Sequence, residues 1–251
     1  MTIVAVSNQK GGVGKTTIAF NLAKGLAARG QRVLAIDNDP QGNLTHALLA
    51  EPEAFKADIF SYYKPDAGNA IPQVVAENLF LLGANQGLAT VTDLQIDDAL
   101  FGLREGLAML EKDFDYILID CLPSFGVLQL AALTAADEVL IPVTPANFSV
   151  QGLTTLFDTI TRAQKRFNAK LSVLGIVLNR IDGRRTTIGD GLVELIRETY
   201  TDLVFKSAIP QSVRVEESYS FNQSVLEYEP KGKVAEQMNR FIEEFLSRHA
   251  H

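Results

Sequence analysis

The chain has 251 residues, of which 47% are hydrophobic and 21% charged, so it is long enough to fold around a large core. Its net charge of −7 argues against a protein that coats nucleic acid over its whole surface. No apolar stretch approaches the roughly 20 residues of a membrane-spanning helix. The single cysteine, Cys121, excludes an internal disulfide and a cysteine-ligated cluster within one subunit.

The sequence alternates between short apolar runs and amphipathic segments. Strands are predicted at 2–7, 32–37, 78–82, 115–120, 138–143, 172–178 and 203–208. Helices are predicted at 15–29, 41–49, 86–98 (with a possible break), 101–112, 125–136, 149–167, 185–200, 212–219 and 231–248. This order predicts a single α/β domain over residues 1–251, with a mainly parallel, twisted sheet that helices cover on both faces. Residues 51–76, which are rich in proline and glycine, are expected to be an irregular surface excursion.

The N-terminus leads directly into the first predicted strand. We therefore expect no signal peptide, no helix-turn-helix domain before residue 2, and a location in the reducing cytosol, which the lone cysteine also fits.

Charge is distributed unevenly along the chain. Residues 1–150 carry 9 Lys and Arg against 17 Asp and Glu, whereas residues 151–251 carry 14 against 13. Any nucleic-acid surface should therefore lie in the C-terminal half. Charge alone favours the simpler interpretation that this half is a solvated surface without a partner.

The segment Lys10–Thr17, KGGVGKTT, is the most informative motif. It fits the phosphate-binding pattern G-x-x-x-x-G-K-[ST] if the first glycine is replaced by Gln9 or Lys10. The backbone of Gly11, Gly12, Val13 and Gly14 would approach the phosphates, Lys15 would reach the β- and γ-phosphates, and Thr16, beside Thr17, would hold Mg²⁺. A glycine-rich turn with unrelated lysines is the alternative, but a strand precedes the segment and a helix follows it, as an anion site requires.

Lys10 is a second lysine within this loop. A second lysine is redundant for one nucleotide on one subunit, which indicates a role elsewhere, such as across a dimer.

Three aspartates follow predicted strands. Asp37 ends the run VLAID, Asp39 lies in the next loop, and Asp120 ends the run YILID. Ligands of open α/β sheets bind at the carboxyl ends of strands, so we expect Asp120 to support Mg²⁺. Of Asp37 and Asp39, we expect one to serve the water shell of Mg²⁺ and the other to position the attacking water. The alternative for Asp39 is a turn residue before Pro40. The three histidines show no metal-ligand spacing, and Cys121 is expected to be a small packed residue.

These motifs, with the later segments 209–215 and 228–236, resemble the ParA/MinD family of ATPases with a deviant Walker A box, and most of all the short Soj-like ParA partition proteins. The resemblance covers almost the whole chain. It implies that Lys10 reaches the nucleotide of the opposite subunit in an ATP sandwich dimer. It also implies that Lys15 and Thr16 bind phosphate and Mg²⁺, that Asp39 is needed for hydrolysis, and that Asp37 belongs to the metal shell.

The resemblance extends to the base. Asn179 matches the adenine-reading position, and Pro210 lies in the loop that usually covers the base. The chain departs from the family near Asn147, where relatives often carry an acidic residue at the rim of the site.

The implied function is a cytoplasmic, nucleoid-associated ATPase that dimerises on ATP and binds nonspecific DNA as a dimer. A ParB-like or other adaptor would stimulate slow hydrolysis and release it. The cargo, whether a plasmid, a chromosome or a protein compartment, is left open. The DNA-contacting candidates are Arg184, Arg185, Lys206, Arg214, Lys231 and Lys233. For each of them, a solvated surface charge is the alternative.

Other functions of the same fold remain open. A MinD-like membrane protein would need a basic amphipathic C-terminal helix, but residues 238–248 carry Glu243 and Glu244 beside their aromatic residues, which favours a helix packed on the core. A metabolic enzyme such as a dethiobiotin synthetase-like ligase would not need Lys10. A relative of the nitrogenase iron protein would need cluster cysteines that are missing. A scaffold that does not hydrolyse nucleotide would not need both Asp37 and Asp39.

Overall fold

The computed structural model describes residues 1–51, 55–64, 69–145, 150–182 and 187–249. The strands are β1 (Thr2–Val6), β2 (Val33–Asn38), β3 (Gln73–Ala76), β4 (Leu79–Leu82), β5 (Tyr116–Cys121), β6 (Glu138–Val143), β7 (Ser172–Ile181) and β8 (Val204–Pro210). The α-helices are α1 (Lys15–Ala27), α2 (Asn43–Leu48), α3 (Ile96–Ala108), α4 (Val127–Ala135), α5 (Val150–Arg166), α6 (Thr187–Tyr200), α7 (Val213–Ser220), α8 (Val225–Tyr228) and α9 (Lys233–Arg248). Short 3-10 helices are η2 (Ile59–Tyr63), η3 (Gln86–Asp93) and η5 (Thr201–Leu203).

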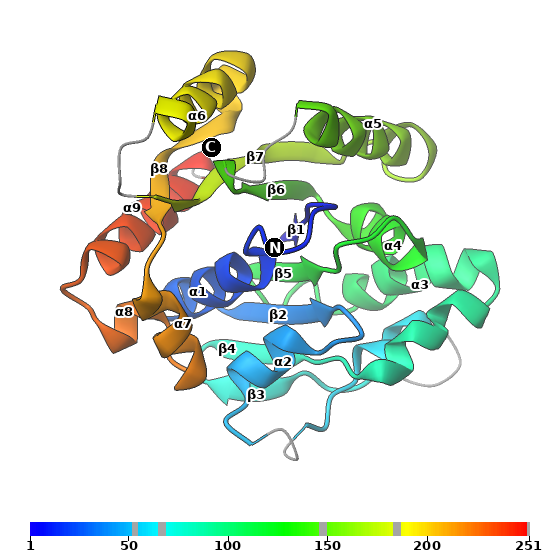
Figure 1. Ribbon diagram of the computed structural model, residues 1–251. Helices are drawn as coiled ribbons and strands as arrows, with labels where there is room; N and C mark the ends of the chain where they lie inside the picture. The colour runs from blue at the N-terminus through cyan, green and yellow to red at the C-terminus, as the bar shows by residue number, and fades with distance from the viewer. Residues whose placement is uncertain (52–54, 65–68, 146–149, 183–186, 250–251) are drawn as a thin grey trace.

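The strands form one sheet in the order β3-β4-β2-β5-β1-β6-β7-β8 (Figure 1). All neighbouring pairs are parallel except β3 and β4. In register, Asp120 of β5 lies beside Val6 of β1 on one side and beside Asp37 of β2 on the other. The carboxyl ends of these three strands therefore meet at one edge of the sheet, where ligands of such sheets bind.

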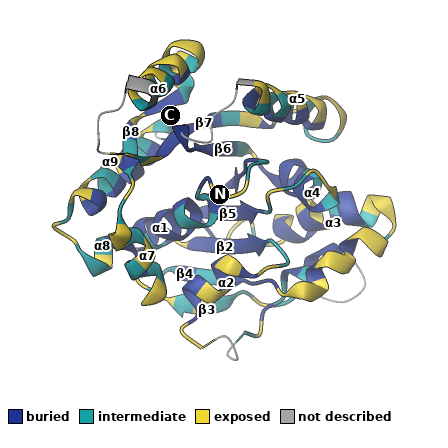
Figure 2. Cartoon of the chain, viewed as in Figure 1, coloured by how far each residue is buried: buried dark blue, intermediate teal, exposed yellow. Residues whose placement is uncertain are grey.

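Helices cover both faces of the sheet, because successive side chains of a strand point to opposite sides. In β1, Ile3 and Ala5 belong to the apolar core under α3, α4 and α5. Val4 and Val6 belong to the second core, under α1, α2 and α9. In Figure 2 the central strands β1, β2 and β5 are coloured as buried along almost their whole length. The predicted α/β architecture is confirmed.

All seven predicted strands are present, but the segment 51–76 differs from the prediction. Ile59, Tyr62 and Tyr63 of η2 are at most 2% exposed, and β3 adds an antiparallel edge strand. The prediction of an irregular surface excursion was therefore wrong for residues 57–63. Prolines and glycines on either side hid a short apolar run, IFSYY, that lacks a full helical period.

Two further segments also differ. The helix predicted at 86–98 is the 3-10 helix η3, and α3 begins only at Ile96. The short helix α8 was not predicted, although its N-terminus carries a capping box in which Ser224 and Glu227 hydrogen-bond each other's backbone. The Ser-x-x-Glu spacing was a usable signal.

The C-terminal helix α9 packs on the core, as expected. Met238, Phe241 and Phe245 are fully buried, and the Phe241 ring meets Phe205 of β8 edge-on at 5.0 Å between centroids. Glu244 accepts hydrogen bonds from the backbone N–H groups of residues 206 and 207 of β8, at 2.8 and 3.0 Å. No helix in the described part of the chain is both long and apolar enough to cross a membrane.

Replacement of Phe241 by alanine tests this packing. Phe241→Ala should lower the free energy of unfolding by about 3–5 kcal/mol, because it leaves a cavity between α9 and β8. Urea denaturation measures the change. Arg240→Ala, on the exposed side of the same helix, is the control and should change the free energy by less than about 0.5 kcal/mol. Equal effects of the two variants would mean that α9 does not contribute to the core.

Candidate functional site

The loop between β1 and α1 is shaped by glycines in the left-handed region. Gly12 has φ 73° and Gly14 has φ 87°, conformations that cost little only for glycine. A Cβ atom at Gly14 would also collide with the side-chain amide of Asn179. Gly14 is the N-cap of α1 and offers no side chain to cap it, so the first N–H groups of α1 are available to an anion.

Polar side chains from distant strands fix this loop. The Asn179 side chain at the end of β7 donates to the Val13 carbonyl at 2.9 Å. Asn8 donates to the carbonyl of Pro142 in β6 at 2.8 Å and accepts from the backbone N–H of Lys10 at 3.0 Å. The loop is thus held in place from both of these strands.

Lys15 begins α1 and is 7% exposed. Its ammonium donates to the carbonyl of Lys10 at 3.2 Å, which accounts for one of its three donors. Burial lowers the pKa of Lys15, and the negative charges of Asp120 and Asp39 act in the opposite direction. The loop therefore holds a cation close to two carboxylates.

Asp120 is almost completely buried, and its Oδ1 atom has no hydrogen-bond partner among the described residues. Burial, together with the neighbouring charge of Asp37, raises the pKa of Asp120 well above its usual range, while a hydrogen bond from the Thr16 side chain lowers it. A buried carboxylate oxygen without a partner beside a hydroxyl is the kind of oxygen donor set that Mg²⁺ uses. Asp120 and Thr16 therefore fit the metal.

No group of three or more His, Cys, Asp or Glu side chains that could hold a metal occurs in the described ranges. Mg²⁺ normally keeps several waters and is bound by one or two protein carboxylates together with the phosphates of a substrate.

Asp37 is fully buried and is used largely within the chain. Its Oδ2 atom accepts from both the backbone N–H and the hydroxyl of Thr45, each at 2.8 Å, and its Oδ1 atom accepts from the backbone N–H of Asp39 at 3.2 Å. These bonds tie the end of β2 to the first turn of α2. Burial raises the pKa of Asp37 to about 6. Its place in the metal shell stays a prediction.

Asp39 takes part in the turn that was its alternative interpretation, and its role in positioning the attacking water stays a prediction. Its carboxylate accepts from the backbone N–H of Gln41 at 3.0 Å, and its carbonyl accepts from that of Gly42 at 2.9 Å. Asp39 is therefore a turn residue. It also lines the cavity that opens beside the loop.

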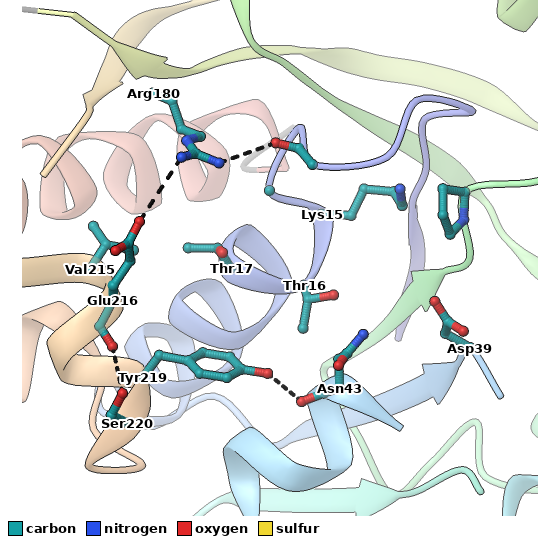
Figure 3. A pocket seen from close by; sticks show the side chains of 13 residues that line it. Lys15, Thr16, Thr17, Asp39, Asn43, Arg180, Val215, Glu216, Tyr219 and Ser220 are labelled. Carbon is teal, nitrogen blue, oxygen red and sulfur yellow. Dashed lines mark hydrogen bonds and ion pairs between the residues drawn. The ribbon is translucent and has the colours of Figure 1, made fainter. Parts of the chain in front are cut away.

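This cavity has a volume of about 510 Å³ and lies between the glycine-rich loop and α7 (Figure 3). It is lined by Gly12, Gly14, Lys15, Thr16, Thr17, Asp39, Asn43, Pro123, Arg180, Val215, Glu216, Tyr219 and Ser220. Several predicted phosphate-site residues therefore lie at one place. Lys10 is not among the lining residues.

A smaller cavity of about 80 Å³ adjoins the larger one. Asn179 and Pro210 both line it, together with Gln211 and Ser212. The two residues that were assigned to the base therefore lie together beside the phosphate loop, although they are far apart in the sequence.

Sequence reasoning missed the far wall of the larger cavity. Arg180, with φ 56°, places its guanidinium 3.5 Å from the Gly12 carbonyl and 4.0 Å from the Glu216 carboxylate. The hydroxyl of Tyr219 donates to the carbonyl of Asn43 at 2.5 Å (Figure 3). Helix α7 was predicted, but it has only eight residues. Its sequence pattern was too short to show which of its side chains would face the cavity.

The DNA candidates are spread over the molecule. Lys206, Arg214, Lys231 and Lys233 are all exposed, whereas Arg184 and Arg185, like Asn147, lie outside the described residues. The backbone of Lys206 contacts Glu244 of α9, about 16 Å along the helix from Lys233 at 1.5 Å per residue. The structure therefore does not bring these lysines into one patch.

Arg214 is engaged by acidic neighbours. Its guanidinium lies 2.7 Å from the carboxylate of Glu217 and 3.8 Å from that of Glu229. These carboxylates would compete with a DNA phosphate for the same side chain.

Comparisons with known proteins agree with this geometry. A family model described as an AAA domain matches residues 1–173. The chain is 36% identical over 239 residues to the sporulation initiation inhibitor protein Soj of Bacillus subtilis, covering 93% of this chain and 94% of that protein. It is 35% identical over 255 residues to the chromosome partitioning protein ParA of Caulobacter vibrioides, covering 99% and 95%.

A solved structure of similar fold is cobyrinic acid a,c-diamide synthase from Mycobacterium smegmatis, with a bound ATP analogue and magnesium. It has a TM-score of 0.83 and 30% identity, and the match covers 100% of this chain and 96% of that one. The length of these matches and the shared motifs agree, and the chain belongs to the ParA/MinD family, on its Soj/ParA branch.

Proposed function

We propose that this protein is an ATP- and Mg²⁺-dependent positioning ATPase of the partition type. The observation that carries the proposal is the convergence of Lys15, Thr16 and Asp39 on one cavity, beside a buried Asp120 oxygen that lacks a hydrogen-bond partner among the described residues. The similarity to the chromosome partitioning protein of Caulobacter vibrioides supports the partition role.

The shape of the site supports ATP binding. The phosphates of ATP would lie against the N–H groups of residues 11–17 and the ammonium of Lys15. The base of ATP would lie in the smaller cavity beside Asn179 and Pro210. Thr16 and Asp120 would hold Mg²⁺, with Asp37 behind them. When bound, the metal neutralises charge that develops on the phosphate oxygens.

Hydrolysis would need a water molecule placed in line with the γ-phosphate. The oxygen of that water bonds to the γ-phosphorus while the bond to the bridging oxygen breaks, leaving ADP and inorganic phosphate. Asp39, at the rim of the cavity, would orient the water and accept its proton. Lys15 would offset the charge on the phosphates.

The switch between two states would depend on Lys10. Its backbone is bonded within the loop, but its side chain is not part of the cavity lining. We infer that it binds the nucleotide of a second copy, so that two chains close around two ATP molecules.

Binding of nonspecific DNA by this dimer would be salt-dependent, because Lys and Arg contacts to phosphate dominate it. A dimer presents each basic site twice, so it can contact more DNA phosphates at once than a single chain can. An adaptor of the ParB kind would accelerate hydrolysis and release the protein from the nucleoid. The difference in DNA affinity between the two states is what could position a cargo.

A metabolic ligase is the second candidate. The amide synthase of similar fold favours it, and the 510 Å³ cavity could take more than a nucleotide. Addition of plasmid DNA to an ATPase assay separates the two proposals. A change in turnover supports the positioning ATPase, whereas turnover that depends on a small carboxylic acid and ignores DNA supports the ligase.

Substitution of Asp39 tests the hydrolysis step. Asp39→Asn keeps an oxygen that can accept from the N–H of Gln41 but removes the charge. ATP turnover should fall by about 10²–10⁴-fold, and size-exclusion chromatography with light scattering should show an ATP-dependent dimer accumulating. Asp39→Ala, which also removes the turn contact, should behave alike. Undiminished turnover by Asp39→Asn would remove Asp39 from the chemistry.

Substitution of Lys10 tests the dimer. Lys10→Ala leaves the backbone bonds of the loop in place, so one chain should still bind ATP in calorimetry. Dimer formation with ATP and Mg²⁺ should be lost. Lys15→Ala is the matched control, because it should abolish ATP binding itself. A Lys10→Ala protein that dimerises normally would show that Lys10 has no role across subunits.

Charge reversal tests the DNA surface. Arg214→Glu and Lys206→Glu should each weaken retention of plasmid DNA by the ATP-bound protein, and the loss should be larger at low salt. ATP affinity should be unchanged, because neither residue lines the cavity. If only Lys206→Glu weakens retention, the carboxylates of Glu217 and Glu229 already occupy Arg214 and its DNA assignment is wrong.

A further inference from the structure

The two cavities of the site share one wall. The residues that line both are Gly14, Thr17, Arg180, Val215 and Glu216. The sugar of a nucleotide joins its base to its phosphates. If the phosphates lie at the glycine-rich loop and the base lies beside Asn179, as proposed above, the sugar must lie against this shared wall.

Glu216 is the acceptor that this wall offers to a sugar. Gly14 and Val215 have no polar side-chain atoms, and the guanidinium of Arg180 can only donate hydrogen bonds. Thr17 has one hydroxyl, whereas the Glu216 carboxylate has two oxygens and carries a charge. Hydrogen bonds to an ionised acceptor are the stronger kind, and a carboxylate is the group that binds the ribose 2′-hydroxyl in dinucleotide-binding folds.

The surroundings of Glu216 leave its carboxylate able to accept hydrogen bonds from a sugar. Its side chain is 76% exposed, and its Oε1 atom lies 4.0 Å from Arg180, at the outer limit of an ion pair. Its backbone is held in α7, where its carbonyl accepts from the Ser220 hydroxyl at 3.0 Å. Figure 3 shows the Glu216 side chain directed toward Arg180, with a dashed line that marks their ion pair.

Arg180 offsets the charge of Glu216 beside the loop where the nucleotide phosphates would lie. Its guanidinium lies between the Gly12 carbonyl of the phosphate loop and Glu216, at 3.5 and 4.0 Å. A cation at this point offsets the repulsion between Glu216 and the nucleotide. Arg180 is thus a positioning residue for Glu216.

We propose that Glu216 accepts hydrogen bonds from the 2′- and 3′-hydroxyls of the bound nucleotide and makes the protein select ribonucleotides over deoxyribonucleotides. A site built to bind a hydroxyl rejects an analogue that lacks it, because its own polar group is then left without a partner.

Isothermal titration calorimetry with ADP, 2′-deoxy-ADP, 3′-deoxy-ADP and 2′,3′-dideoxy-ADP tests this proposal. Diphosphates avoid both hydrolysis and dimerisation, and unlabelled sugars keep the hydroxyls free. The unmodified protein should bind ADP at least about tenfold more tightly than 2′,3′-dideoxy-ADP, because the loss of even one hydrogen bond to a charged group has an effect of this size and the compound lacks both hydroxyls. The two single-deoxy compounds identify which hydroxyl contributes more.

Glu216→Ala should reduce this preference to less than about twofold, and Glu216→Gln, which keeps the size but not the charge, should give an intermediate value. Glu217→Gln, at the next position of α7, is the matched control and should keep the full preference, because Glu217 contacts Arg214 and Tyr228 outside the cavity. Thermal melting of each variant confirms that it is folded.

Equal affinity of the unmodified protein for ADP and 2′,3′-dideoxy-ADP would overturn the proposal. So would an undiminished preference in Glu216→Ala. Failure of the unmodified protein to bind ADP, ATP and all three deoxy compounds would contradict the proposed function, and the assignment of Glu216 would fall with it.

Discussion

The site depends on the close approach of the Gly14 backbone to the side chain of Asn179. The amide of Asn179 occupies the space that any Cβ at Gly14 would need, and it donates to the neighbouring Val13 carbonyl. One contact therefore requires glycine, fixes the loop and places Asn179 at the edge of the smaller cavity. The phosphate loop and the proposed base position are therefore in direct contact through Asn179.

The acidic side of the site follows from strand register in the same way. Because Asp37 and Asp120 are neighbours across β2 and β5, two carboxylates are buried side by side. The two carboxylates have different hydrogen-bond partners. Thr45 donates twice to Asp37, whereas Asp120 receives a hydrogen bond from Thr16 and keeps one oxygen without a partner in the described chain. Similar sequence contexts thus produce two aspartates with different capacities to bind a cation.

Much of this was predictable from the sequence, because the signals are local. The strand, glycine-rich loop and helix order fixed the first half of the site, and apolar runs that end in aspartate indicated the rest. The contacts between α7 and the phosphate loop were not predictable. Arg180 and Glu216 are ordinary charged residues in their own segments, and only the folded chain places them together. Asn179 was assigned through family resemblance, and its contact with Gly14 has no sequence signal.

Helix α7 connects what is proposed as the nucleotide site to what is proposed as the DNA surface. Glu216 and Tyr219 face the cavity, while Arg214 of the same helix is bonded to Glu217 and Glu229 away from it. Tyr219 also binds the carbonyl of Asn43, and Asn222, just beyond α7, donates to the carbonyls of His46 and Ala47 at 2.8 and 3.0 Å. Helix α7 is thereby fastened to α2, whose first turn Asp37 holds. A shift of α7 relative to α2 would have to break bonds at both ends of α2, so a movement that keeps these bonds must carry the two helices together.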